Sequence, residues 1–249
     1  MNIEPVAVFH SPFNSKFGIP KQSGIVGALK GEIVFLPAYR NPDALRGLEA
    51  FDYLWLIWEF SANRHHANSL MVRPPRLGGN EKVGVFASRS PFRPNALGLS
   101  SVKIETIEWE TSRGPIIHVL GADLMDVTPI YDIKPYITYA DAHVDARSGF
   151  VDRHQWKRLD VVIGSEAQDF LLSYGFDVAR IDELKSILAE DPRPQYQEDP
   201  DKIYGMPFAG IDVHFQVKGN VLTVLAVWNT VVWLFQPWCF PMVLSEGEL

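Results

Sequence analysis

Residues 53–60 read YLWLIWEF, an apolar and aromatic run that follows Asp52 and ends before Ser61. Aromatic and β-branched side chains favour a pleated, half-buried strand. Similar short runs recur through the first half of the chain, each bounded by turn residues: Pro5–Phe9, Gly31–Phe35, Val83–Ala87, Leu99–Trp109 and Ile116–Ala122. Many short strands with few helical periods between them predict an antiparallel sheet or a closed barrel rather than a βαβ nucleotide-binding fold.

The periodicity changes after about residue 148. Apolar positions then recur at helical spacing in three segments: Val151–Arg158, Glu166–Tyr174 and Ile181–Leu188. Ser165 suits a helix N-cap and Gly175 suits a helix stop. Val213–Val217 and Val221–Val227 flank the three-residue connection Lys218–Asn220, which predicts a hairpin. We therefore expect a mainly β chain with added helices (α+β), divided into a β domain over residues 1–147 and a smaller α+β domain over residues 148–249.

Composition restricts the function classes. The 249 residues contain a single cysteine, Cys239, which excludes an intrachain disulfide and a multi-cysteine zinc site and fits a reducing cytoplasm. His65 and His66 are adjacent rather than at ligand spacing, so no metal is predicted. No G-x-G-x-x-G motif follows a strand, which leaves a Rossmann site unsupported. The first residues, MNIEPVAVFH, lack the features of a secretory signal, so we expect a cytoplasmic protein.

Charge is distributed unevenly along a chain whose net charge is −7. Residues 64–94 contain one acid, Glu81, and six basic side chains: Arg64, Arg73, Arg76, Lys82, Arg89 and Arg93. Prolines and glycines interrupt this segment and predict a shaped loop around the short strand Val83–Ala87. By contrast, residues 182–201 hold seven acids and only two basic side chains. Such an asymmetry can orient a nucleic acid, although a solvated basic loop would have the same composition.

The segment Val221–Leu244 has no charged side chain and is long enough to span a bilayer. Asn229, Gln236 and two prolines interrupt it, and it begins with the predicted hairpin. We therefore expect a buried strand followed by an apolar docking tail, with no membrane partner. The role of Trp228–Leu249 does not follow from the sequence.

Five blocks of the sequence resemble, in order, the signatures of the TsaA/TrmO family of S-adenosylmethionine-dependent tRNA methyltransferases. The blocks are HSPFNSKFGIPKQSG (His10–Gly24), FDYLWLIWEF (Phe51–Phe60), Arg73–Ser100, DLMDVTPIYDIKPY (Asp123–Tyr136) and Asp191–Met206. Motifs of this length are more specific than short patterns. The resemblance implies a small β-barrel methyltransferase domain, a homodimer, and S-adenosylmethionine as the cofactor. It also implies a tRNA substrate carrying N6-threonylcarbamoyladenosine beside the anticodon, at position 37, with the methyl group placed on N6.

Positions that match the family's cofactor contacts follow from this resemblance. They are Pro20, Lys21, Gln22, Ser61, Ala62, Arg89, Leu99, Leu124, Met125, Asp126 and Val127. Two blocks depart from the family pattern. Ser61 and Ala62 stand where the family commonly has a His-Gln pair, and Val127 stands where it has a glycine. Two questions therefore stay open: whether side chains at Ser61 and Ala62 form hydrogen bonds to the cofactor, and whether Val127 adopts a positive φ.

The acceptor nitrogen implied by the resemblance is a poor nucleophile, because its lone pair is delocalised into the purine and the ureido carbonyl. A base that removes its proton would help, and we take Asp126, with Tyr136 behind it, as the catalytic candidates. Arg93 or Lys134 suits the threonyl carboxylate. The remaining substrate-binding candidates are Arg73 and Arg76, for tRNA phosphate. Asp126, Asp132 and Lys134 are expected in one short loop, where an ordinary ion pair is the alternative to a catalytic arrangement.

Three functions remain open on the sequence. The first is methylation of the modified adenosine in the anticodon loop of tRNA. The second keeps S-adenosylmethionine but changes the acceptor to another RNA or a small molecule. The third is a non-catalytic module that binds the cofactor or RNA, and it would bind S-adenosylmethionine without producing S-adenosylhomocysteine.

Overall fold

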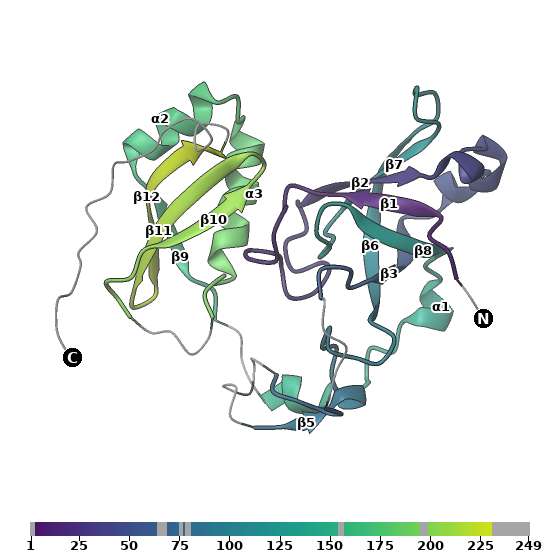
Figure 1. Ribbon diagram of the computed structural model, residues 1–249, viewed down its shortest axis with the longest axis horizontal. Coiled ribbons are helices and arrows are strands. Elements are labelled where there is room, and N and C mark those ends of the chain that lie inside the picture. Colours follow the sequence, from purple (N-terminus) through teal and green to yellow (C-terminus); the bar gives the residue numbers. More distant parts are fainter. Residues whose placement is uncertain are drawn as a thin grey trace, which may run out of the picture.

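The computed structural model describes residues 3–63, 69–74, 77, 81–153, 157–194 and 199–230. Six antiparallel strands close into a barrel in the order β1-β2-β7-β6-β3-β8 (Figure 1). Their bounds are β1 Ala7–His10, β2 Lys30–Phe35, β3 Tyr53–Glu59, β6 Leu97–Glu108, β7 Ile116–Leu120 and β8 Thr128–Pro135. Closure leaves every one of these strands paired on both sides.

Alternation along the strands fills the barrel interior. In β3 the side chains of Leu54, Leu56 and Trp58 are buried, and the residues between them are more exposed. Two glycines allow large rings to enter the interior, because Gly31 lies against Phe9 and Gly98 lies against the Trp58 indole. The barrel is therefore a packed core, and any ligand site has to be built from the loops at its ends.

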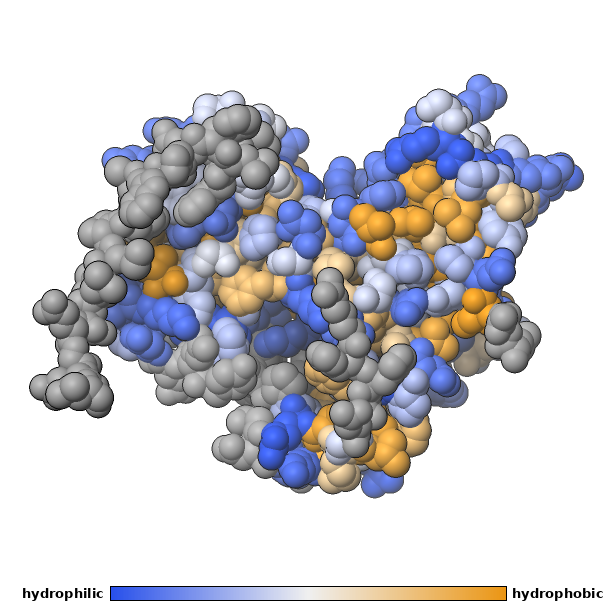
Figure 2. Space-filling view, in the orientation of Figure 1, coloured by the Kyte–Doolittle hydropathy of each residue, from blue (hydrophilic) through white to orange (hydrophobic). Residues whose placement is uncertain are grey.

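Several short elements connect or extend the barrel strands. A two-stranded ribbon pairs β4 (Met71–Val72) with β5 (Val83–Gly84). The helical turns are η1 Pro37–Tyr39, η2 Pro42–Leu45, η3 Leu48–Ala50, η5 Val85–Ala87, α1 Thr138–Asp141 and η6 Gly149–Arg153. Figure 2 shows hydrophobic residues beside hydrophilic ones at the end of the molecule that carries β5. This end therefore exposes both apolar and charged side chains.

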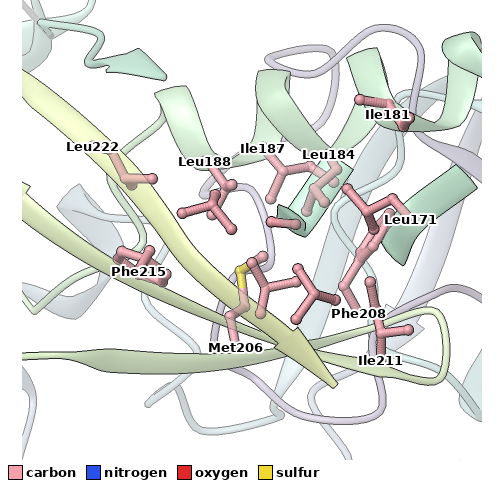
Figure 3. Packing of buried hydrophobic residues seen from close by; sticks show 14 of the residues in the cluster. Leu171, Ile181, Leu184, Ile187, Leu188, Met206, Phe208, Ile211, Phe215 and Leu222 are labelled. Atoms are coloured by element: carbon pink, nitrogen blue, oxygen red, sulfur yellow. The ribbon is translucent and has the colours of Figure 1, made fainter. Parts of the chain in front are cut away.

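A second unit follows the barrel in the chain. Its sheet has the order β10-β11-β12-β9, with β9 parallel to β12 and the other pairs antiparallel. Two helices cover one face of the sheet. The bounds are β9 Asp160–Ile163, α2 Ser165–Ser173, α3 Val178–Ala189, β10 Tyr204–Phe208, β11 Ile211–Lys218 and β12 Val221–Asn229. Leu184, Leu188 and Phe215 are among the fully buried residues between helices and sheet (Figure 3).

The loop between β1 and β2 crosses from the barrel into this second core. Phe13, Val26 and Leu29 belong to the same buried cluster as the residues of α3 and β10. The Phe13 ring meets the Phe208 ring edge to face, with centroids 5.6 Å apart. The amide of Ala209 donates to the Pro12 carbonyl at 2.8 Å. The two units are thus joined by packing and hydrogen bonding as well as by the chain.

The expected mainly β, α+β fold is confirmed, with several local differences. The Val83–Ala87 strand is shorter than predicted, because β5 ends at Gly84 and a helical turn follows. Gly164, not Ser165, occupies the N-cap of α2. The Gly149–Arg153 turn replaces the start of the helix predicted at Val151–Arg158, whose residues 154–156 lie outside the described residues.

Other strands differ from the prediction. The hairpin connection has two residues, since Lys218 pairs with Val221. β8, β9 and β10 were not predicted, and β8 lies within the Asp123–Tyr136 block, which was expected to be a loop. Among the described residues, no helix combines the length and the apolar character needed to cross a membrane. Residues 231–249 of the predicted docking tail lie outside the described residues.

Candidate functional site

A cleft of about 220 Å³ opens where β3 ends and β8 begins. Four segments far apart in sequence build it: the β1–β2 loop, the end of β3 with the residues that follow, the segment with Arg89 and Pro91, and the loop that leads into β8. Its lining residues are Lys16, Ile19, Pro20, Lys21, Gln22, Trp58, Glu59, Phe60, Ser61, Ala62, Asn63, Arg89, Pro91, Asp123, Met125 and Thr128.

Most of the positions expected to contact the cofactor meet at this cleft. Those in its lining are Pro20, Lys21, Gln22, Ser61, Ala62, Arg89 and Met125. Leu124 is instead buried in the barrel core. Leu99 is 57% exposed, between the inward-facing Gly98 and Ser100 of β6, so its side chain points away from the barrel interior. Asp126 and Val127 follow the lining residue Met125 but are not part of the lining.

Arg89 closes one side of the cleft. Its Nη1 donates to Oε1 of Gln22 at 2.6 Å, which joins the basic loop to the β1–β2 loop. Arg93 instead bonds to the backbone of its own loop: its Nη1 donates to the carbonyls of Ser88 and Ser90 at 3.0 and 3.3 Å. The Arg93 guanidinium therefore braces the loop that presents Arg89.

Asp123 is a functional candidate that the sequence reasoning missed. It lines the cleft, and its Oδ1 accepts a hydrogen bond from Ser100 Oγ at 2.6 Å. Ser100 Oγ in turn accepts from Trp58 Nε1 at 3.0 Å. Burial raises the pKa of Asp123 despite opposing hydrogen bonds from Ser100 and from backbone amides, and despite the positive charge of Arg89. The signal in the sequence was an aspartate directly after the buried run that ends at Ala122.

The predicted catalytic pair is not assembled. Oδ1 of Asp126 lies 3.0 Å from Nδ1 of His10 and accepts from the Ser11 amide at 3.2 Å. Tyr136 packs against Tyr53 and Trp55 at the opposite end of β8. Seven strand steps separate the ends of β8, roughly 23 Å at the usual rise. The prediction that Tyr136 lies behind Asp126 is therefore wrong.

The prediction that Asp126, Asp132 and Lys134 lie in one short loop is also wrong. Asp132 and Lys134 lie on β8, which pairs with β1 and β3, whereas Asp126 precedes the strand. Lys134 Nζ is 2.9 Å from Oδ2 of Asp132, and both side chains are largely exposed. Such a surface pair contributes little to stability. It does not touch Asp126.

Tyr131 and Glu59 form a second polar contact near the cleft. The Tyr131 hydroxyl donates to Glu59 Oε2 at 2.5 Å. This hydrogen bond is the main cause that raises the pKa of Tyr131 to about 12. Tyr131 therefore stays protonated at neutral pH and holds Glu59 at the rim.

Of the predicted tRNA contacts, the described residues Arg73, Arg93 and Lys134 are not part of the cleft lining. Arg73 is exposed beside β4, and Arg76 lies outside the described residues. Phe86 and Phe92 flank Arg89 in sequence and are 76% and 50% exposed. Within the described part of the chain, no group of three histidine, cysteine, aspartate or glutamate side chains is placed to hold a metal ion.

Val127 has a φ of 59°, in the left-handed region. The positive φ that the sequence left open is therefore present. For a β-branched residue this conformation is rare and costs free energy, which glycine avoids. The strain sits one residue after Asp126 and one before the start of β8, where it turns the chain into the strand.

Replacing Val127 with glycine is expected to raise the free energy of unfolding by about 1 kcal/mol, because relief of strain exceeds the entropy cost of glycine. Urea denaturation would measure the change. Val144→Gly is the control, since Val144 is also exposed but is not among the positive-φ residues. An equal loss of stability in both variants would show that the backbone at Val127 is not strained.

Comparison with known proteins assigns both parts of the chain. Residues 8–142 match the model of the tRNA-methyltransferase O N-terminal domain, and residues 157–230 match the TrmO C-terminal domain. The tRNA (adenine(37)-N6)-methyltransferase of Escherichia coli K12 is 35% identical over 228 residues, 90% of this chain and 96% of that protein. Its human namesake is 40% identical over 141 residues, 56% of this chain and 31% of that protein.

A solved structure agrees with these matches. The crystal structure of TrmO from Pseudomonas aeruginosa superposes with a TM-score of 0.75 at 32% identity, covering 92% of this chain and 97% of that one. Sequence and fold therefore agree over nearly the full length of both proteins. The chain belongs to the TrmO family, as its loop signatures indicated.

Proposed function

We propose that this protein is an S-adenosylmethionine-dependent methyltransferase that modifies adenine 37 of tRNA. One observation carries the proposal: seven positions that match the family's cofactor contacts, drawn from separate segments, line a single cleft. Relatives that share most of the chain's length are named as tRNA (adenine(37)-N6)-methyltransferases. We further propose N6-threonylcarbamoyladenosine, in the anticodon loop, as the acceptor.

The residues present fit the proposed cofactor. The cleft offers apolar surface from Ile19 and Pro20, a guanidinium from Arg89 and a half-buried carboxylate from Asp123. S-adenosylmethionine combines an apolar-faced nucleoside, a carboxylate and cationic groups, and when bound it supplies an activated methyl group. The loops would hold it by backbone groups and orient it toward the acceptor, which is the main demand of an in-line transfer.

The acceptor nitrogen must lose a proton, and Asp126 is the proposed base. Its Oδ1 is held by His10 and by the Ser11 amide. The loop is further fixed by a 2.7 Å hydrogen bond from the Asp126 amide to the Phe13 carbonyl. Asp126 would thus act from a fixed position beside Met125, which lines the cleft.

Arg73, Arg76, Arg93 and Lys134 are the proposed contacts to tRNA. Basic side chains and the exposed rings of Phe86 and Phe92 suit an anticodon loop, whose unstacked bases can stack on aromatic rings while its phosphates meet cations. We also propose a homodimer in the cytoplasm. The exposed side chains of Met71 in β4 and of Leu70 just before it offer apolar area for a second copy.

We also propose that the chain divides into a catalytic domain of residues 1–147 and a second domain of residues 148–249. All six barrel strands end by Pro135, and the second sheet begins at Asp160. The cleft nevertheless includes the β1–β2 loop, which packs into the second core.

Transfer of labelled methyl from S-adenosylmethionine to two matched tRNA preparations tests the function. One preparation carries threonylcarbamoyladenosine and the other lacks it. Label is expected only in the modified tRNA. Label in both would discard the proposed specificity but keep the methyltransferase. Label in neither, with cofactor binding retained, would favour another acceptor or a non-catalytic module.

A further inference from the structure

The charge of Asp123 is only partly compensated where its side chain lines the cleft. Burial acts on its carboxylate, and the salt bridges among the described residues do not include it. Arg89 acts on it only through space, and the Arg89 guanidinium donates to Gln22 instead. An ionised carboxylate removed from water is costly unless a cation or several donors compensate it. Ser100, backbone amides and Arg89 offset part of this cost at Asp123, but the effect of burial is larger.

The hydrogen-bond chain behind Asp123 fixes the direction of its bonds. The indole N–H of Trp58 can only donate, so Ser100 Oγ accepts from it. The Ser100 proton is then directed to Asp123, whose Oδ1 is an acceptor. Trp58 is itself wedged in the barrel core. Asp123 is therefore held rigidly, with one oxygen engaged from behind and its side chain at the cleft wall.

We propose that Asp123 is the counter-ion for a positively charged group of the cofactor. The proposal rests on the proposed function, because it takes S-adenosylmethionine as the ligand of the cleft. That molecule carries two cationic groups, the sulfonium and the α-ammonium. Either could pair with the Asp123 carboxylate, which has no salt bridge among the described residues, and Arg89, which also lines the cleft, suits the ligand's carboxylate.

Isothermal titration calorimetry with three ligands tests this assignment. S-adenosylmethionine has both cationic groups, S-adenosylhomocysteine keeps only the ammonium, and methylthioadenosine has neither. Asp123→Asn should weaken S-adenosylmethionine roughly 30-fold or more, as expected for loss of one partner of a desolvated charge pair. Methylthioadenosine should bind within about twofold of wild type, because the nucleoside contacts remain. Asp182→Asn is the control: it removes one charge from the exposed face of α3 and should leave the affinities for all three ligands unchanged.

The pattern of losses identifies the role. If Asp123→Asn weakens the binding of both S-adenosylmethionine and S-adenosylhomocysteine, Asp123 pairs with the ammonium. If it weakens only the binding of S-adenosylmethionine, Asp123 pairs with the sulfonium. Both results support a counter-ion. An equal loss for methylthioadenosine would mean that Asp123 holds the nucleoside, which overturns the proposal. Unchanged binding of S-adenosylmethionine by Asp123→Asn would overturn it as well. If wild type binds no S-adenosylmethionine, the proposed function fails together with this inference.

The melting temperature of Asp123→Asn separates a binding defect from a folding defect. Asparagine keeps an oxygen that accepts from Ser100. Because burial raises the pKa of Asp123, ionisation at neutral pH lowers the stability of the folded protein. The amide removes this cost, so the variant is expected to melt at the wild-type temperature or above it. A clearly lower melting temperature would attribute any loss of binding to the fold and overturn the assignment.

Discussion

Replacing Gly98 with alanine is expected to lower the free energy of unfolding by about 3 kcal/mol and to abolish measurable cofactor binding. An added Cβ would lie 2.3 Å from Cε2 and 2.5 Å from Cζ2 of Trp58. The indole cannot yield easily, because it is buried and meets Phe60 edge to face at 4.4 Å. Displacing it would break the hydrogen bond to Ser100 and with it the support of Asp123.

Chemical denaturation and calorimetry with S-adenosylmethionine would measure both effects. Gly84→Ala is the matched control, since a Cβ at Gly84 meets nothing within 4 Å and its φ of −61° suits alanine. We expect the control to unfold like wild type. A Gly98→Ala protein as stable as the control would show that Trp58 can move without cost, contrary to the packing described above.

Phe13→Ala is expected to destabilise the second core by about 4 kcal/mol, the usual cost of deleting a buried phenylalanine ring. The ring is fully buried in the cluster that contains α3 and β10, although its backbone belongs to the β1–β2 loop. Its loss leaves a cavity against Phe208 and Met206, both of which are also fully buried. The same loop carries Pro20 and Gln22, so the KM for S-adenosylmethionine should rise as well.

Calorimetric unfolding should then show two transitions, with the α2–α3 unit melting before the barrel. Phe51→Ala serves as the control, because Phe51 is a partly exposed ring on the barrel side and should give a small loss and a single transition. A single cooperative transition in Phe13→Ala, with little change in KM, would contradict a structural link between the two units.

The strands and the family could be predicted from particular residues. Leu54, Leu56 and Trp58 alternate with exposed positions, and this alternation survives folding because one face of β3 must enter the barrel. β8 was missed because Pro129, Pro135, Asp132 and Lys134 interrupt its apolar pattern. Its place between β1 and β3 comes from barrel closure, which is a property of all six strands together.

The site was predictable only where loop signatures carry it. Pro20–Gln22 and Arg89 were found because their blocks are distinctive, and they do meet at the cleft. Asp123 was missed because its pKa depends on burial and on Ser100 from another strand. The far position of Tyr136 follows from the length of β8, which local sequence did not reveal. Contacts between distant segments therefore account for most of the errors.

Closure of the barrel also affects how the protein can change over generations. Because every barrel strand is paired on both sides, its hydrogen-bond ladder is insulated from the loops at its mouth. Ser61 and Ala62 lie beyond the end of β3, and Val127 lies before the start of β8. Substitutions at these positions can reshape the ligand site without breaking a strand pair. The barrel is thus a stable platform on which acceptor preference is free to drift, as enzymes recruited to new substrates require.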